Sequence, residues 1–280
     1  MQTPTIAIIG GTSKFGQLWQ RYFEGKGLRV IIASRSTEIT PEQAVKEADI
    51  IIVSVSIRAT VNTIENLVPH IPPGKLLLDF TGIKTEATQA LLGYTTGEVV
   101  ATHPMFGPWI TSLQDQNIAF DPLRPGEKWN FLSHLWKADG ANLIELPSRK
   151  HDELVAIVQS TVHIMNLMFG HLLAKRRIDI EELMKISTPN SRMQLCILAR
   201  FLNQEAALYT DMQTENTVYR NEILPDIESY FHDLAELLRT GQGTDFENEF
   251  NLAKAHIGPD FLAKALKVSS EFDEHLKKNL

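Results

Sequence analysis

The clearest indication of the fold is the stretch at residues 5–16, which reads Thr-Ile-Ala-Ile-Ile-Gly-Gly-Thr-Ser-Lys-Phe-Gly. The run Thr5–Ile9 is short, apolar and rich in β-branched residues, and it ends at two glycines, which is typical of a buried parallel strand that turns into a helix. From Phe15 the apolar residues recur at helical spacing, and a second apolar run at residues 29–33 follows a Gly-Lys-Gly stop. The stretch therefore predicts one βαβ unit.

The turn after the first strand is a candidate phosphate-binding site. Backbone N–H groups and the positive end of the helix would receive the pyrophosphate of a dinucleotide there. Ser13 stands where the dinucleotide-binding fingerprint has its middle glycine, so a tight turn without a ligand is the alternative. The cofactor-binding residues predicted in this turn are Gly11, Thr12, Ser13, Lys14, Phe15 and Gly16.

The segment after the second strand carries Ser34, Arg35 and Ser36 and no carboxylate. A fold that prefers NAD usually has Asp or Glu here to bind the ribose hydroxyls. A guanidinium between two hydroxyls suits a 2′-phosphate instead, so we predict a cofactor site that prefers NADP over NAD. The alternative is that Arg35 is a solvated loop residue.

The rest of the chain continues this alternation and then changes character. Strands are expected at 50–55, 76–79, 98–101 and 142–146, helices at 41–46, 59–67, 85–92 and 131–138, and a loop at 121–129. From His151 onward the apolar spacing is helical throughout. We predict an α/β Rossmann-type domain with a doubly wound parallel sheet at 1–147, and an all-helical domain at 148–280.

Composition narrows the class of partner. At 280 residues with 43% hydrophobic content the chain is long enough for two domains with cores. The net charge of −7 argues against a nucleic-acid partner. The single Cys196, the absence of a basic leader and the absence of about 18 consecutive apolar residues predict a cytoplasmic protein without a membrane segment.

His103 is the most informative titratable residue, because it lies in the stretch Thr-His-Pro-Met-Phe-Gly-Pro at 102–108. Proline fixes its own φ and removes a backbone donor, so the histidine is held at a set angle near the predicted nucleotide site. A neutral imidazole beside a dinucleotide is a natural proton acceptor for hydride chemistry. A surface histidine in a kinked loop is the alternative.

Several spaced motifs make the chain resemble the prephenate and arogenate dehydrogenases of tyrosine biosynthesis, nearly end to end. These motifs are Val-Ser-Val-Ser-Ile-Arg-Ala-Thr at 53–60, Asp-Phe-Thr-Gly-Ile-Lys at 79–84, His-Pro-Met-Phe-Gly-Pro at 103–108 and the helical segment 187–200. The resemblance implies a Rossmann domain, a helical domain that forms a homodimer, and oxidative decarboxylation of a cyclohexadienol with hydride transfer to NAD(P). It also implies a small-molecule substrate, prephenate or arogenate.

The resemblance assigns roles to individual residues. His103 matches the histidine that accepts the hydroxyl proton, and Arg200 matches the arginine that binds the substrate carboxylate. Arg192 supports Arg200 or, alternatively, caps a helix. Lys84 matches a lysine that holds the substrate or the loop around it, and His163 matches a histidine near the nicotinamide. Exposed lysine and core histidine are the structural alternatives for the last two.

Two residues depart from the family pattern. The family usually has a substrate-binding serine where Gly82 stands, and Thr81 would have to replace it as the substrate-binding residue. The family commonly has a small or acidic residue where Trp109 stands. His151, His171, His232 and His256 match no family position, and because no His-Glu-x-x-His pattern occurs we predict no metal.

Competing functions remain open at this point. Arogenate dehydrogenase is one, and a catalytically weak, NADP-binding sensor is another. A reductase of the 6-phosphogluconate or 3-hydroxyacid dehydrogenase type is disfavoured by the 103–108 motif. With no mutase helices before residue 5 and no regulatory segment after the helical part, we expect a monofunctional enzyme.

Overall fold

The computed structural model describes residues 3–279 and divides the chain into two compact units. Unit 1 comprises Met1–Ala156 together with Thr210–Thr217, and unit 2 comprises Ile157–Tyr209 together with Val218–Leu280. Each unit has its own packing and is described separately.

Unit 1 is built on a seven-stranded sheet in the described part of the chain, with strand order β2-β1-β3-β4-β5-β6-β7. The strands are β1 (Ile6–Ile9), β2 (Val30–Ala33), β3 (Ile50–Val53), β4 (Leu76–Asp79), β5 (Glu98–Pro104), β6 (Asn117–Arg124) and β7 (Asn142–Glu145). The first five are parallel to one another, and residues 6–9, 50–53 and 76–79 are buried on both faces. The Rossmann-type fold predicted from the sequence is confirmed.

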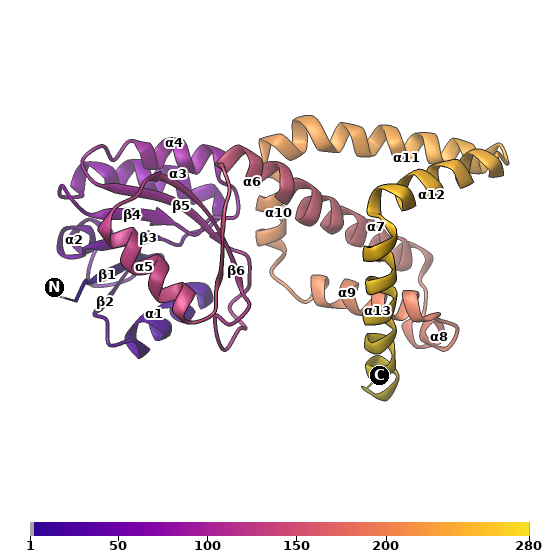
Figure 1. Ribbon diagram of the computed structural model, residues 1–280, viewed down its shortest axis with the longest axis horizontal. Helices are drawn as coiled ribbons and strands as arrows, with labels where there is room; N and C mark the ends of the chain where they lie inside the picture. The colour runs from indigo at the N-terminus through magenta and orange to yellow at the C-terminus, as the bar shows by residue number, and fades with distance from the viewer. Residues whose placement is uncertain (1–2, 280) are drawn as a thin grey trace. The chain divides into compact units, whose positions relative to one another are not determined.

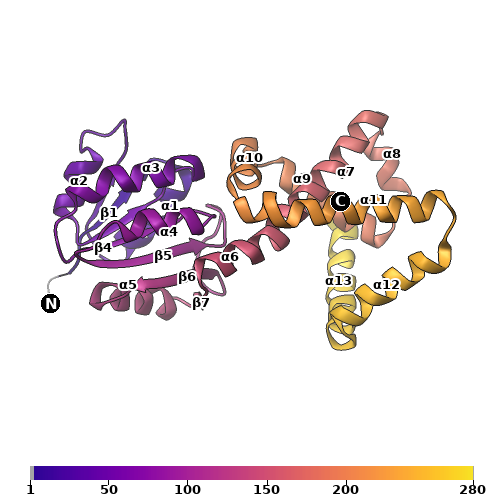
Figure 2. The same cartoon turned by 90° about the horizontal axis from the view of Figure 1, so that it is seen from above.

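Helices cover both faces of this sheet (Figures 1 and 2). The apolar cluster on one face lies under α1 (Lys14–Gly25) and α5 (Glu127–Ala138), and its largest fully buried side chains are Trp19 and Trp136. The opposite cluster packs under α2 (Pro41–Glu47), α3 (Ile57–Leu67) and α4 (Thr85–Leu92). A short 3-10 turn, Val68–His70, follows α3. Because the clusters bury both faces, only the ends of the strands are left for a ligand.

Two details of this unit differ from the sequence prediction. The loop expected at 121–129 is wrong, because β6 continues to Arg124 and pairs antiparallel with β5, and α5 begins at Glu127. Its alternation of apolar and polar residues is weak, and pairing with β5 supplies the order that the local pattern lacks. Strand β5 also extends to Pro104, so His103 lies in the last part of a strand and not in a turn.

Unit 1 also includes α6 (Ser148–Val155) and the end of α10 (Ala206–Glu215). Ser148 donates both its backbone N–H and its hydroxyl to Asp121 Oδ2 on β6, each at 2.7 Å. Arg58, at the start of α3, pairs with Asp211 at 2.7 Å and with Glu215 at 3.2 Å. These contacts fix both segments to the sheet domain.

Unit 2 is helical. Its elements are a π-helical turn (Ala156–Thr161), α7 (Val162–Arg176), α8 (Ile180–Lys185), α9 (Pro189–Leu202), a second π-helical turn (Tyr219–Ile223), α11 (Leu224–Arg239), α12 (Gly243–Ile257) and α13 (Pro259–Asn279). Helix α9 packs on α7 and α13, and α11 packs on α12 (Figure 2). By length and composition alone, the helical stretch 148–176 is long and apolar enough to cross a membrane.

Candidate active site

The carboxyl ends of the parallel strands bring four predicted site segments to one edge of the sheet in unit 1. The glycine turn follows β1, the Ser34–Ser36 segment follows β2, Thr81 and Gly82 follow β4, and His103 lies near the end of β5. Because the parallel strands run in the same direction, all four segments meet at the edge where doubly wound folds bind their ligands.

The glycine turn has the close packing that a dinucleotide site requires. Gly10 has a φ of +85°, and a Cβ there would lie 2.3 Å from the Ser54 carbonyl oxygen. A Cβ on Gly16 would lie 2.4 Å from the Cα of Gly11, so helix α1 approaches the turn as closely as a glycine allows. Ser13 accepts a hydrogen bond at its Oγ from the Gly16 N–H at 3.0 Å and caps the helix.

The start of α1 is exposed beside this cap. The helical ladder begins with the bond from Gln17 N–H to the Ser13 carbonyl at 2.9 Å, so the N–H groups of Lys14 and Phe15 precede it. The side chains of Thr12, Ser13 and Lys14 are exposed. An exposed helix N-terminus with a lysine in its first turn fits a pyrophosphate.

The segment after β2 forms a hydroxyl-rich turn. Ser34 N–H donates to Thr37 Oγ1 at 2.8 Å, and the hydroxyls of Ser34 and Ser36 lie 3.1 Å apart. The Arg35 side chain between them is exposed. The turn therefore presents two hydroxyls and one guanidinium at the end of the strand.

Trp109, the second departure from the family pattern, lies beside the glycine turn. Its indole is 64% exposed, and the Lys14 ammonium lies 5.2 Å from the ring centroid. This is a cation–π contact between the loop that follows β5 and the first residue of α1.

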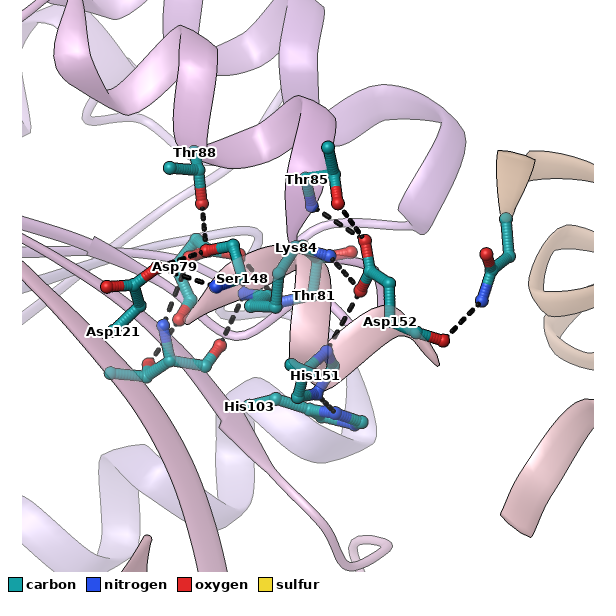
Figure 3. A network of polar contacts seen from close by, with 12 residues as sticks. Asp79, Thr81, Lys84, Thr85, Thr88, His103, Asp121, Ser148, His151 and Asp152 are labelled. Atoms are coloured by element: carbon teal, nitrogen blue, oxygen red, sulfur yellow. Dashed lines mark hydrogen bonds and ion pairs between the residues drawn. The ribbon is translucent and has the colours of Figure 1, made fainter. Parts of the chain in front are cut away.

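His103 is buried and held by a second histidine (Figure 3). Its Nδ1 lies 2.8 Å from His151 Nε2, and the exposed fractions of the two residues are 8% and 2%. Burial is the largest cause that lowers the pKa of His103 well below its usual value of 6.5, and electrostatic interactions with His151 and Lys84 act in the same direction. The imidazole is therefore neutral at pH 7 and able to accept a proton.

Asp152 ties this pair to helix α4. Its Oδ1 lies 2.9 Å from His151 Nδ1 and accepts from Lys84 N–H at 2.8 Å, while Oδ2 accepts from both the N–H and the hydroxyl of Thr85. These bonds lower the pKa of Asp152 even though burial opposes the shift, so the residue is a carboxylate. Asp152 supplies the N-terminal cap that α4 lacks from its own sequence.

The Lys84 ammonium is engaged inside unit 1 (Figure 3). It contacts Asp79 Oδ2 at 2.5 Å and donates to the Thr102 carbonyl at 2.6 Å, and the residue is only 2% exposed. Asp79 also accepts from the N–H groups of Thr81 and Thr102, at 3.0 and 3.3 Å. Burial lowers the pKa of Lys84 more than Asp79 raises it. The predicted catalytic role of Lys84 stays a prediction.

Gly82 lies against the free edge of the His103 ring. A Cβ at this position would be 3.5 Å from His103 Nε2 and 3.6 Å from Cε1, which is ordinary contact. The backbone thus has room for a serine there. The neighbouring Thr81 hydroxyl is buried and has no hydrogen-bond partner within residues 3–279, so it is available to a ligand only if it turns toward one.

In unit 2 the predicted residue His163 lies beside two aromatic rings. The His163 ring stacks on Phe201 with centroids 5.4 Å apart and meets Tyr209 edge-on at 4.6 Å. Burial lowers the pKa of His163 to about 4. Burial raises the pKa of Tyr209, and the charge of Arg200, which is exposed, opposes that shift. The cluster combines a neutral imidazole and two aromatic rings.

Arg192 is engaged within unit 2. Its guanidinium lies 2.8 Å from Asp273 on α13 and donates to the Ser187 carbonyl at 2.8 Å. The two bonds join α9 to α13 and to its own preceding turn. Its role in binding substrate therefore stays a prediction.

The sequence reasoning missed His151 and Asp152. They are adjacent on α6, and only the fold brings them to the end of β5 and the start of α4. Asp79 was quoted in a motif but not given a role, and a carboxylate directly after three buried leucines was the available signal.

Comparisons with known proteins identify the family. Residues 29–145 match the family model described as prephenate dehydrogenase, nucleotide-binding domain, and residues 147–252 match the one described as prephenate dehydrogenase, dimerization domain. The glycine turn lies before the first matched residue, so its assignment rests on the structure.

Two curated relatives match over most of the chain. The chain is 31% identical over 275 residues to a probable arogenate/prephenate dehydrogenase of Methanocaldococcus jannaschii, covering 91% of this chain and 61% of that protein. It is 30% identical over 269 residues to the T-protein of Haemophilus influenzae, covering 95% of this chain and 70% of the relative. The chain thus spans roughly two thirds of the length of these relatives.

The fold also matches a solved structure. The prephenate dehydrogenase from A. aeolicus in complex with hydroxyphenyl propionate and NAD+ has a TM-score of 0.66 at 13% identity, covering 92% of this chain and 99% of that one. At this identity the likeness concerns the fold. The two domain matches and the T-protein relative together show that the chain belongs to the prephenate dehydrogenase family.

Proposed function

We propose that this chain catalyses the oxidative decarboxylation of prephenate to 4-hydroxyphenylpyruvate, with hydride transfer to a nicotinamide cofactor. The observation that supports it most is His103, a buried neutral imidazole at the carboxyl edge of the sheet. Its Nδ1 is taken up by His151, so the edge that carries Nε2 is the one left for a substrate. A base in this place accepts the proton of the ring hydroxyl.

The cofactor residues fit a nicotinamide dinucleotide. The close packing of Gly11 and Gly16 and the exposed first turn of α1 favour a pyrophosphate there. When bound, the cofactor supplies a hydride acceptor. We infer that NADP is preferred, because Arg35 with the Ser34 and Ser36 hydroxyls suits a 2′-phosphate. The A. aeolicus structure holds NAD+, so both cofactors enter the test.

The chemistry of the substrate sets what the remaining residues do. Loss of the hydroxyl proton and of a hydride leaves a carbonyl, and loss of the ring carboxylate as carbon dioxide then makes the ring aromatic. Arg200 is our candidate for a substrate carboxylate, since its guanidinium is exposed on α9 and a bidentate fork suits that group. Burial is the main cause of the lowered pKa of His103, and the buried Lys84 acts in the same direction.

We infer that unit 2 makes the chain a homodimer. The matched family model is described as a dimerization domain, and large apolar side chains are exposed on α7, α11, α12 and α13. Among them are Met165, Leu172, Phe231, Leu238, Phe250, Leu252 and Phe261. We assign the exposed apolar side chains of α7, the later part of the 148–176 stretch, to such an interface. A cytoplasmic location stays our proposal from the sequence.

A spectrophotometric assay that crosses prephenate and arogenate with NADP and NAD tests the proposal. We expect reduction of the nicotinamide with prephenate, faster with NADP than with NAD. Turnover only with arogenate would move the assignment to that substrate, whose amino group replaces a keto group. Cofactor binding without turnover of either substrate would refute the proposal and favour the sensor alternative.

A further inference from the structure

Two histidines and a carboxylate form a hydrogen-bonded row that begins at His103 Nδ1, on the side of the ring opposite the substrate-facing Nε2 (Figure 3). His103 Nδ1 and His151 Nε2 are 2.8 Å apart, and His151 Nδ1 and Asp152 Oδ1 are 2.9 Å apart. The three residues are 8%, 2% and 1% exposed, so water does not compete for these bonds. His103 lies on β5, and His151 and Asp152 lie on α6, so this hydrogen-bonded row joins two elements of the same unit.

The contacts of Asp152 determine where the protons lie. Its carboxylate accepts from Lys84 N–H, Thr85 N–H and the Thr85 hydroxyl, and a carboxylate has no proton to donate. The fourth contact, to His151 Nδ1, therefore requires that nitrogen to carry the proton. With a single proton on the His151 ring, held on Nδ1 by Asp152, Nε2 is an acceptor and His103 Nδ1 donates to it. A second proton on His151 would reverse that bond, and the tautomer measurement described below distinguishes the two arrangements.

We propose that His151 is a positioning residue that fixes His103 as the tautomer with a proton on Nδ1 and a bare Nε2, and that Asp152 in turn fixes His151. The inference rests on the proposed function for its catalytic meaning. In the reaction the substrate O–H bond breaks, its proton goes to His103 Nε2, and its electron pair forms the carbonyl as the hydride leaves. The positive charge formed on His103 is stabilised by Asp152 through the two hydrogen bonds.

A merely structural role for His151 is separable from this one. Asp152 holds α4 through Lys84 and Thr85, and Ser148 holds α6 through Asp121, without any contribution from the His151 ring. The ring itself makes two hydrogen bonds, to Asp152 Oδ1 and to His103 Nδ1, and the second of these reaches the proposed base. Replacing it changes the state of His103 and leaves the anchoring of both helices in place.

Two substitutions at position 151 separate the roles. His151→Leu introduces an apolar side chain of similar size and removes both hydrogen bonds of the ring. His151→Gln places an amide oxygen near the position of Nε2, where it accepts from His103 Nδ1–H. We expect His151→Leu to lower kcat about 10²- to 10⁴-fold with KM for cofactor and substrate within about threefold, and His151→Gln to recover at least about tenfold of that loss.

The control is the same leucine substitution at His134, an exposed histidine on α5 whose ring contacts the Asn130 carbonyl of its own helix. We expect this substitution to leave kcat unchanged. Equal kcat for His151→Leu and His151→Gln, or a His151→Leu protein as fast as the parent, would overturn the proposal.

Nitrogen NMR of the unsubstituted protein tests the tautomer without any assay of turnover. With ¹⁵N-labelled histidine, and with the His103 signals assigned by their loss in His103→Asn, we expect a protonated Nδ1 and an unprotonated Nε2 at pH 7. A proton on Nε2 would overturn the inference even if the enzyme is active. The expected tautomer in a protein that does not turn over prephenate would leave the inference standing and refute the proposed function.

Discussion

The buried pair formed by Lys84 and Asp79 gives the sharpest prediction about stability and mechanism together. The two residues are 2% and 0% exposed, and their side chains meet at 2.5 Å. Lys84→Met keeps the length of the side chain and leaves Asp79 as a buried carboxylate with only the Thr81 and Thr102 N–H groups. Breaking one side of such a pair typically costs about 3–5 kcal/mol.

Because those two N–H bonds remain, we expect the lower end of the range, about 3 kcal/mol. For a unit of this size that corresponds to a fall of roughly 6–12 °C in the Tm of unit 1. The double substitution Asp79→Asn with Lys84→Met removes the orphaned charge, so we expect it to be more stable than Lys84→Met alone. Circular dichroism during heating and urea denaturation measure both.

The same substitution tests the electrostatic role of Lys84. Its positive charge contributes to the lowered pKa of His103, so removing it raises that pKa toward 6.5. The acid limb of kcat/KM then moves to higher pH in Lys84→Met, with little change in the rate at alkaline pH where His103 is neutral in both proteins. An unchanged Tm together with an unchanged pH profile would show that the pair neither stabilises unit 1 nor acts on the pKa of His103.

Three further predictions concern the edge of the sheet. A serine side chain at position 82 has room beside His103, and we expect Gly82→Ser to raise kcat/KM for prephenate about tenfold, which corresponds to one hydrogen bond. Gly82→Ala supplies the same Cβ without the hydroxyl, so we expect no such rise. A Gly82→Ser protein slower than the parent would contradict this prediction. Arg35→Ala should raise KM for NADP about 10- to 100-fold and leave KM for NAD within about threefold, and equal effects on both cofactors would remove the 2′-phosphate assignment. In the parent enzyme, the lowered pKa of His103 places the loss of kcat/KM on acidification below pH 6.5, and a plot of kcat/KM against pH with its acid inflection above 6.5 would contradict the burial argument.

Local pattern was sufficient for most of unit 1. The strands at 6–9, 50–53 and 76–79 and the helix Thr85–Leu92 are apolar runs with clear ends, and buried parallel strands leave that signature. Strand β6 was missed because its pairing with β5 is a long-range contact, and its own sequence, with a proline and an arginine near the end, resembles a loop.

The candidate site shows the same division. His103 and Gly82 were found from motifs, but the partners that set their chemistry were not. His151 lies 48 residues from His103 in sequence, and Asp152 lies 68 residues from Lys84, so their contacts depend on the fold and leave no trace in local spacing. The burial of Lys84 likewise follows from the strand ends around it, whereas its residue type indicated exposure.

Prephenate-dependent reduction of NADP by His103→Asn, measured together with the Kd of the same protein for NADP, is the experiment closest to the proposed role of His103 as acceptor of the substrate hydroxyl proton. We expect a loss of at least about 10²-fold in kcat with a Kd within about threefold of the parent value. Turnover equal to that of the parent enzyme would contradict it.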